Sequence, residues 1–173
     1  VMLGLFILLQ TDIRDRMLSM FRTQENLERL YTWESTLFMI KDYPLFGIGK
    51  GNYAKVAPKY RTPYGDFEFT SRAHAHNNIL QVTVEGGIFS ILSFLWLWTV
   101  IFRELYHTYQ QIPEQNTSLK WLSVGFLCAI VAFFVQGFFE HNWSDSESVT
   151  MMWLITALSL KLQKLITVEN TSE

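Results

Sequence analysis

The sequence predicts an all-α fold: a fragment of a polytopic membrane protein with about three transmembrane helices, the end of a fourth and a large, partly helical outer loop. Apolar residues make up 49% of the 173 residues and charged residues only 17%, whereas an average soluble domain carries roughly 25% charged residues. The mean hydropathy is only +0.12, so the apolar residues must be concentrated in segments. Such segments are present, and two of them reach the roughly 20 residues that a helix needs to cross a bilayer.

Three apolar runs supply the predicted transmembrane helices. The run 79–102 contains a single charged residue, Glu85, and the run 121–139 contains none. The third run, 149–166, ends as an amphipathic segment before the tail 167–173. Helices buried in a large soluble core are the alternative, but such helices rarely run this long without a polar stripe.

Residues 1–10, VMLGLFILLQ, are also apolar. They are too short to cross a bilayer. No basic segment precedes them and no small-residue cleavage site follows, so they do not resemble a signal peptide. We expect them to be the end of a truncated transmembrane helix, and the chain to be the C-terminal part of a larger protein.

The connections between the runs predict how the chain is oriented. The loop 103–120 begins and ends with a basic residue, and two lysines lie near the end of the last run, whereas the loop 140–148 has three carboxylates and no Lys or Arg. Because short cytoplasmic loops are enriched in basic residues, we place the loop 103–120 and the tail 167–173 in the cytoplasm. The large loop 11–78 and the loop 140–148 then lie outside.

Charge and cysteine content exclude two classes of function. A net charge of −2 argues against nucleic-acid binding. The single cysteine, Cys128, lies within the second apolar run and allows neither a disulfide within the chain nor a thiol metal site. The apolar runs in turn predict membrane lipids as neighbours.

The large outer loop should contain a helix over about residues 24–42. Thr23 can cap it, and apolar residues such as Leu30, Leu37 and Phe38 follow the spacing of one helical face. The helix should end before Pro44, which disfavours helix at the residue preceding it. Arg29 and Trp33, four residues apart, share a face and could form a cation–π pair. Further apolar members of the predicted face are Leu27 and Tyr31.

The segment 44–52, PLFGIGKGN, has alternating glycines that allow a left-handed backbone and could expose N–H groups to an anion. It lacks the spacing of a P-loop, and a purely structural turn is the other interpretation. Basic residues and tyrosines follow, a surface suited to phosphate and sugar or to anionic lipid headgroups. The candidate substrate-binding residues here are Lys50, Lys55, Arg61 and Tyr53.

The stretch HAHNN places His74, His76 and Asn77 where the outer loop meets the first full span. A histidine at this interface can act as a base near neutral pH, or the segment can simply cap a helix. Glu140, His141 and Asp145 could complete a polar site, although their spacing fits no common metal site.

Together, these motifs resemble the O-antigen ligase and polymerase family, bacterial inner-membrane glycosyltransferases of the GT-C type. The resemblance covers about residues 14–100, with weaker similarity around residues 140–146, and is carried by an ordered set of motifs. Ser90 departs from it, because the family usually has Gly, Thr or Tyr at that position. The matching residues are Arg29, Trp33, the segment DYPLFGIGKGN over 42–52, the segment HAHNNILQ over 74–81 and the segment EGG over 85–87.

The resemblance implies transfer of a glycan from undecaprenyl diphosphate to an acceptor sugar on the outer face of the inner membrane, without metal or cofactor. The acceptor would be lipid A-core or a growing surface polysaccharide. His76 would activate the acceptor hydroxyl and Arg29 would bind the donor diphosphate, while His74 and Asn77 would contact substrate. The family carries a second essential arginine further upstream, so the fragment alone could be inactive.

Two alternatives remain within the resemblance. Bicarbonate-uptake-associated membrane proteins share the core of the family, which leaves a non-enzymatic role open. A protein O-oligosaccharyltransferase would differ only in its acceptor. Polar residues along the spans would favour transport, but here Glu85, Gln136 and Glu140 are few and lie close to the ends.

Overall fold

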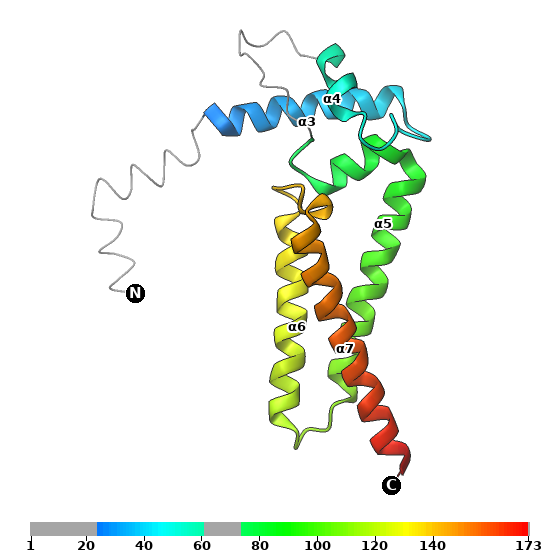
Figure 1. Ribbon diagram of the computed structural model, residues 1–173, viewed down its shortest axis with the longest axis vertical. Coiled ribbons are helices and arrows are strands. Elements are labelled where there is room, and N and C mark those ends of the chain that lie inside the picture. Colours follow the sequence, from blue (N-terminus) through cyan, green and yellow to red (C-terminus); the bar gives the residue numbers. More distant parts are fainter. Residues whose placement is uncertain (1–23, 61–73, 173) are drawn as a thin grey trace, which may run out of the picture.

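The computed structural model describes residues 24–60 and 74–172, and this part of the chain contains helices and turns but no strand. Three long helices run lengthwise as a bundle: α5 (Asn78–Gln111), α6 (Thr117–Gln136) and α7 (Ser146–Ser172) (Figure 1). The predicted all-α fold is confirmed.

The outer segment lies at one end of this bundle. Helix α3 (Gln24–Asp42) crosses the end of the bundle, and the short helix α4 (Tyr53–Val56) lies against it (Figure 1). A 3-10 turn over Ala57–Tyr60 follows α4, and a second one over Asn142–Ser144 joins α6 to α7.

The bundle core is formed mainly by one face of α5. Its buried side chains pack against Ile130 of α6 and Met152 of α7, both at most 1% exposed. The core residues on α5 are Phe94, Trp98, Ile101 and Leu105.

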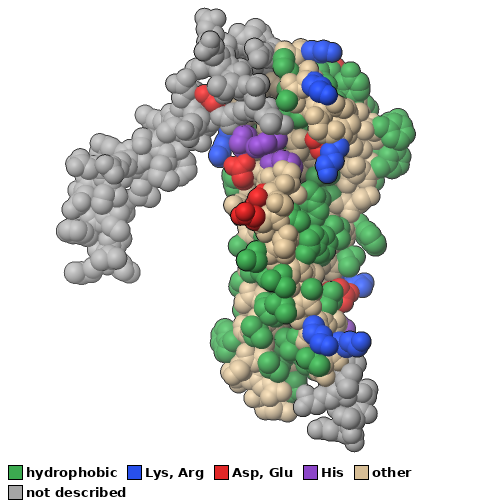
Figure 2. Space-filling model, viewed as in Figure 1, with side chains coloured by type: hydrophobic (Ala, Val, Ile, Leu, Met, Phe, Trp, Pro, Cys, Tyr) green, Lys and Arg blue, Asp and Glu red, His purple; other side chains and the backbone are tan. Residues whose placement is uncertain are grey.

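The three bundle helices are each long and apolar enough to cross a membrane, over Asn78–Gln111, Thr117–Gln136 and Ser146–Ile166. Large apolar side chains cover their outer surface, and Trp96 and Trp121 are 69% and 70% exposed. In Figure 2, hydrophobic side chains cover much of the visible face of the bundle, whereas histidines and carboxylates gather at the end below α3. An apolar exterior of this kind suits contact with lipid or with further transmembrane helices.

The helices extend beyond the predicted spans at several ends. Helix α6 begins at Thr117, ahead of the predicted start at Trp121, and α7 continues to Ser172. Helix α5 continues to Gln111, past the predicted end at Phe102, because Leu105 and Thr108 remain buried against the bundle. Helix α7 begins at Ser146, because the Asp145 carboxylate accepts a hydrogen bond from the backbone N–H of Ser148 at 3.1 Å and caps it. The predicted truncated helix at residues 1–10 lies outside the described residues.

Helix α3 occupies the predicted range but packs through a different face. Leu30, Leu37 and Phe38, on the predicted apolar face, are 46–56% exposed, whereas Thr36 and Met39 are fully buried. The polar face can be buried because its hydroxyls are satisfied: Thr36 Oγ1 bonds the carbonyl of Thr32 at 2.6 Å and the hydroxyl of Tyr53 at 2.7 Å. The helix therefore buries a face other than the one that carries these large apolar side chains.

A break in α5 at Gly87 shapes the end of the bundle. Gly87 has φ +67° and ψ −159°, so its backbone is not helical. Because of this interruption, three backbone groups lose their hydrogen-bond partners within the helix. They are the N–H of Ile88 and the carbonyls of Val84 and Glu85. In the plane of Figure 1, the first turns of α5 run beneath α3, and the helix then turns down into the bundle.

The glycine-rich turn supplies the missing partners. Ile48 and Gly49 donate their N–H groups to the carbonyls of Val84 and Glu85 at 2.8 and 2.9 Å. Pro44 accepts from the N–H of Ile88 at 2.9 Å. The Glu85 carboxylate also accepts from the N–H of Gly51 at 2.9 Å. The structure thus uses these N–H groups within the protein, which favours the structural interpretation of the turn over an anion site.

The two backbones meet so closely that only glycine fits. A Cβ added at Gly87 would lie 2.2 Å from the carbonyl oxygen of Leu45, and one at Gly47 would lie 2.4 Å from the carbonyl carbon of Glu85. Both glycines also have positive φ, +67° and +64°, which a residue with a side chain adopts at a cost of roughly 1–2 kcal/mol.

We expect Gly87→Ala to destabilise the full-length protein by more than about 2 kcal/mol, since backbone strain adds to the overlap with Leu45. Gly125→Ala is the matched control, because a Cβ at Gly125 meets no atom within 4 Å and φ there is ordinary. Thermal unfolding of the purified proteins in detergent measures the difference. Equal midpoints for Gly87→Ala and Gly125→Ala would contradict the packing described here.

Candidate functional site

The histidine segment enters the bundle through the start of α5. Asn77 caps this helix, because its Oδ1 accepts from the N–H of Leu80 at 3.0 Å while its Nδ2 donates to the carbonyl of Phe138 at 2.9 Å. The predicted cap is therefore present. Both polar groups of Asn77 serve the fold, and its predicted contact with substrate stays a prediction.

Asn78 ties the start of α5 to the connection between α6 and α7. Its N–H donates to the carbonyl of Gly137 at 2.7 Å, and its Nδ2 donates to Asn142 Oδ1. Its Oδ1 accepts from the N–H of Trp143 at 3.2 Å and lies 3.2 Å from His141 Nδ1. These bonds hold residues more than 60 positions away in sequence next to the histidine segment.

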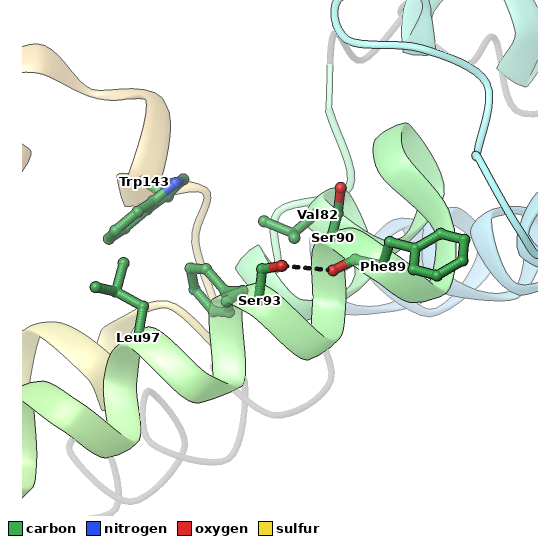
Figure 3. A pocket seen from close by; sticks show the side chains of 7 residues that line it. Val82, Phe89, Ser90, Ser93, Leu97 and Trp143 are labelled. Atoms are coloured by element: carbon green, nitrogen blue, oxygen red, sulfur yellow. Dashed lines mark hydrogen bonds between the residues drawn. The ribbon is translucent and has the colours of Figure 1, made fainter.

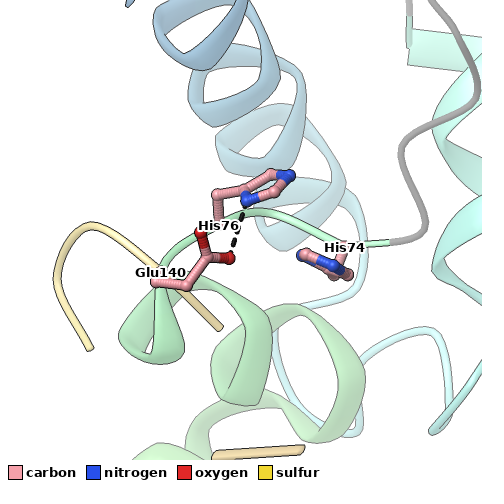
Figure 4. A group of neighbouring side chains, drawn as sticks. All are labelled: His74, His76 and Glu140. Carbon is pink, nitrogen blue, oxygen red and sulfur yellow. Dashed lines mark hydrogen bonds and ion pairs between the residues drawn. The ribbon is translucent and has the colours of Figure 1, made fainter. Parts of the chain in front are cut away.

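Three imidazoles and one carboxylate meet at this point. His76 Nδ1 lies 2.8 Å from Glu140 Oε1, and the ring of His74 lies tilted beside that of His76 with 4.3 Å between centroids (Figure 4). The ring of His141 lies 5.3 Å from that of His74. His76 also has φ +49°, an uncommon backbone state for a residue with a side chain and one often found at functional sites.

The electrostatics of the cluster favour a charged Glu140. Burial raises the pKa of this carboxyl, but hydrogen bonds from the His141 N–H and the His76 ring outweigh burial and lower the pKa below its ordinary value. The stability from this carboxylate is present above the pKa of the unfolded chain and lost as pH falls through the lower folded value. Burial, followed by repulsion from His74, lowers the pKa of His141 and favours its neutral ring.

Helix α3 covers this cluster. The indole N–H of Trp33 donates to the carbonyl of Ala75, between the two histidines, at 3.0 Å. Arg29, half-buried, precedes Trp33 by one helical turn and so shares its face of the helix. The hydrogen bond between Trp33 and Ala75 thus places the face of α3 that carries Arg29 against the histidine segment.

The other predicted binding residues are not drawn into the cluster. The side chains of Lys50 and Lys55 are exposed, and no hydrogen bond or ion pair among the described residues links them to the histidines. Tyr53 is 2% exposed in the core beneath α3, with its hydroxyl on Thr36. Arg61 lies outside the described residues.

A metal ion is one group that the cluster could hold. The ligand atoms of His74, His76 and Glu140 all lie within 4.8 Å of one another, and two imidazoles with a carboxylate are a common ligand set for zinc. In the structure, however, His76 and Glu140 bond each other directly. A metal would have to replace the proton that they share, and chelation distinguishes the two arrangements.

Sequence reasoning identified the polar loop but not its geometry. Glu140 and His141 do join the histidine segment, whereas Asp145 caps α7 instead. No role was predicted for Asn142, or for Asn78 beyond its place in the segment 74–81. Only the concentration of amides and histidines at both helix ends could have indicated such a network.

An apolar groove of about 400 Å³ lies along α5 on the bundle side of the break (Figure 3). Ser93 Oγ in this groove donates to the carbonyl of Phe89, so its hydroxyl is satisfied within the helix. Trp143, two residues after His141, forms one wall, so the groove begins close to the histidine cluster. Its lining residues are Val82, Phe89, Ser90, Ser93, Phe94, Leu97 and Trp143.

Fold and site together define a multi-pass membrane protein with a histidine–carboxylate cluster at one end of its spans. A family model described as O-antigen ligase matches residues 1–95. Because the match covers more than half of the chain, the chain belongs to the O-antigen ligase family. The matched region includes α3, the glycine turn and the histidine segment, whereas Glu140 lies beyond it.

The names of similar proteins are consistent with this family. A Rickettsia conorii protein, provisionally named a polysaccharide ligase, is 26% identical over 82% of the chain and 33% of its own length. A Rickettsia felis protein with the same name is 27% identical over 93% of the chain and 39% of its own length. The teichuronic acid biosynthesis protein TuaE of Bacillus subtilis is 23% identical over 79% of the chain and 26% of its own length. The chain thus spans roughly a third of these relatives.

We expect Asn78→Ala to lower the thermal midpoint of the full-length protein, because it leaves buried groups of Asn142 and Trp143 without partners, at about 1–3 kcal/mol for each group. Thr99→Ala is the control, since the exposed Thr99 hydroxyl bonds only the carbonyl of Leu95 in its own helix. A midpoint for Asn78→Ala that equals the Thr99→Ala midpoint would contradict an anchoring role for Asn78.

Proposed function

We propose that the full-length protein transfers a glycan from an undecaprenyl-diphosphate-linked donor to a sugar hydroxyl, on the outer face of the bacterial inner membrane. The acceptor is lipid A-core or a growing surface polysaccharide. The observation that carries the proposal is the half-buried His76 ring, held at the end of three membrane-capable helices in the region that matches the O-antigen ligase family.

His76 is the proposed general base. Its Nδ1 lies against Glu140, and its Nε2 makes no hydrogen bond within the described residues. The side chain is 21% exposed, which leaves the ring open to an acceptor. Nε2 takes the proton of the acceptor hydroxyl while the oxygen attacks the anomeric carbon. The bond from that carbon to the diphosphate oxygen breaks, and undecaprenyl diphosphate leaves.

Arg29 is the proposed donor-binding residue. A guanidinium can bond two phosphate oxygens at once, and its charge offsets the negative charge that develops on the departing diphosphate. The contact between Trp33 and Ala75 supports this role, because it directs the Arg29 face of α3 to the segment that carries His76.

The named relatives support the substrate class. Polysaccharide ligase and teichuronic acid biosynthesis both concern polymers built from sugars. They differ in the polymer, so the choice between lipid A-core and a polysaccharide chain end as acceptor rests on the family resemblance.

The polar groups near the spans favour an enzyme over a transporter. Glu85 bonds the glycine turn through Gly51, and Gln136 Oε1 lies 3.4 Å from Asn142 Nδ2. Glu140 bonds His76. These polar groups thus form hydrogen bonds within the protein at one end of the bundle. They do not line a path along the spans, as a transporter would require.

We expect His76→Asn to reduce glycan transfer by about 10²–10⁴-fold, the usual contribution of a positioned base. Asn tolerates the positive φ at this position better than Ala does, so the fold is retained. Surface glycan and donor lipid are measured in a deletion strain that carries the full-length gene.

His107→Asn is the matched control, because His107 lies on the opposite end of α5, against Gln163. It should transfer glycan as the wild type does. Normal glycan in His76→Asn cells at equal membrane expression would remove His76 as the base.

We expect Arg29→Lys to raise the KM for the lipid-linked donor roughly tenfold, since lysine keeps the charge but loses the second hydrogen bond to phosphate. The acceptor KM should stay unchanged. Arg103→Lys serves as control, because exposed Arg103 contacts only the neighbouring Glu104 among the described residues. An unchanged donor KM in purified Arg29→Lys protein would exclude diphosphate binding by Arg29.

A further inference from the structure

The connection between α6 and α7 delivers one acidic side chain to the proposed base. Glu140 Oε1 lies 2.8 Å from His76 Nδ1 and also accepts from the N–H of His141 at 3.0 Å. The same carboxylate oxygen therefore accepts from a backbone N–H and contacts the ring. Such a contact between residues 64 positions apart depends on the folded bundle.

We propose that Glu140 is a positioning residue for the base: it holds His76 with the proton on Nδ1 and the lone pair on Nε2 facing the acceptor. This inference rests on the proposed function. It extends the site into a part of the chain that lies beyond the match to the O-antigen ligase family at residues 1–95.

The chemistry requires one defined tautomer. A neutral imidazole carries its proton on either nitrogen, and the partner of one nitrogen decides the state of the other. A carboxylate can only accept, so it fixes the proton on Nδ1 and leaves Nε2 as the base. When Nε2 takes the proton of the acceptor hydroxyl, the ring becomes positive, and the negative carboxylate stabilises that charge.

Two further contacts restrict the ring. The ring of His74 lies against that of His76, tilted by 56° with 4.3 Å between centroids. The backbone of His76 is set in the left-handed region immediately before the capping residue Asn77. With the ring held from these sides, the Glu140 contact decides mainly which nitrogen carries the proton.

The experiment compares Glu140→Gln, Glu140→Asp and the control Glu147→Gln in the purified full-length protein, with lipid-linked donor and acceptor glycan. Glu147 is exposed in the first turn of α7. We expect Glu140→Gln to lower kcat about 10–100-fold with donor KM unchanged, less than the 10²–10⁴-fold loss of the base itself. Glu140→Asp should recover part of kcat, and Glu147→Gln should match the wild type.

A double variant separates positioning from a merely structural role. In His76→Asn/Glu140→Gln the rate should equal that of His76→Asn alone, because Glu140 acts only through the base. Additive losses would overturn the proposal. Unfolding midpoints of all variants are measured. If Glu140→Gln folds poorly, the test uses the kcat of Glu140→Asp, calculated per folded molecule. A kcat equal to that of the wild type would then overturn the proposal.

The results distinguish failure of the role proposed for Glu140 from failure of the proposed function. Wild-type kcat in Glu140→Gln, with His76→Asn inactive, would overturn the role of Glu140 and leave the proposed function standing; an active His76→Asn would sink the proposed function itself. Loss of wild-type activity on chelation, restored by Zn²⁺, would also overturn the proposal, since Glu140 would then act as a metal ligand with His74 and His76.

Discussion

The interruption of α5 at Gly87 is the constraint on which the rest of this end of the molecule depends. A broken helix in a membrane-capable segment exposes backbone groups that lipid cannot satisfy, and each costs several kcal/mol when left unpaired. The glycine turn bonds three of these groups and Glu85 bonds the turn in return. The break and the turn are therefore two halves of one structure, because each supplies hydrogen-bond partners to the other.

The break matters because of where it sends the first turns of α5. These turns carry Asn77 and Asn78, which bind the connection between α6 and α7, and they carry the histidine segment beneath α3. In Figure 1 these first turns run beneath α3 rather than along the bundle. The cost of positive φ at His76 is offset by the satisfied amides around it, whereas Gly87 adopts positive φ without a side-chain clash.

Features encoded in short stretches of sequence were predictable. Three apolar runs, two of them of full spanning length, indicated three membrane-capable helices, and Pro44 indicated the end of α3. The packing face of α3 was not predictable from hydrophobicity, because Thr36 and Tyr53 satisfy each other in the core while Leu37 remains exposed. A buried polar pair leaves no periodic apolar pattern in the sequence.

In the candidate site, too, the locally encoded residues were predictable and their distant partners were not. His76 and Asn77 stand out locally, since a histidine beside a capping residue at the start of an apolar run has a recognisable pattern. The partner of His76 does not, because Glu140 sits in a short acidic loop where any of three carboxylates could serve. Asp145 is used to start α7 and Glu147 is exposed, so the selection of Glu140 follows from the Asn78 and Gly137 contacts that fix the loop. The same contacts that stabilise the bundle thereby decide which carboxylate faces the base.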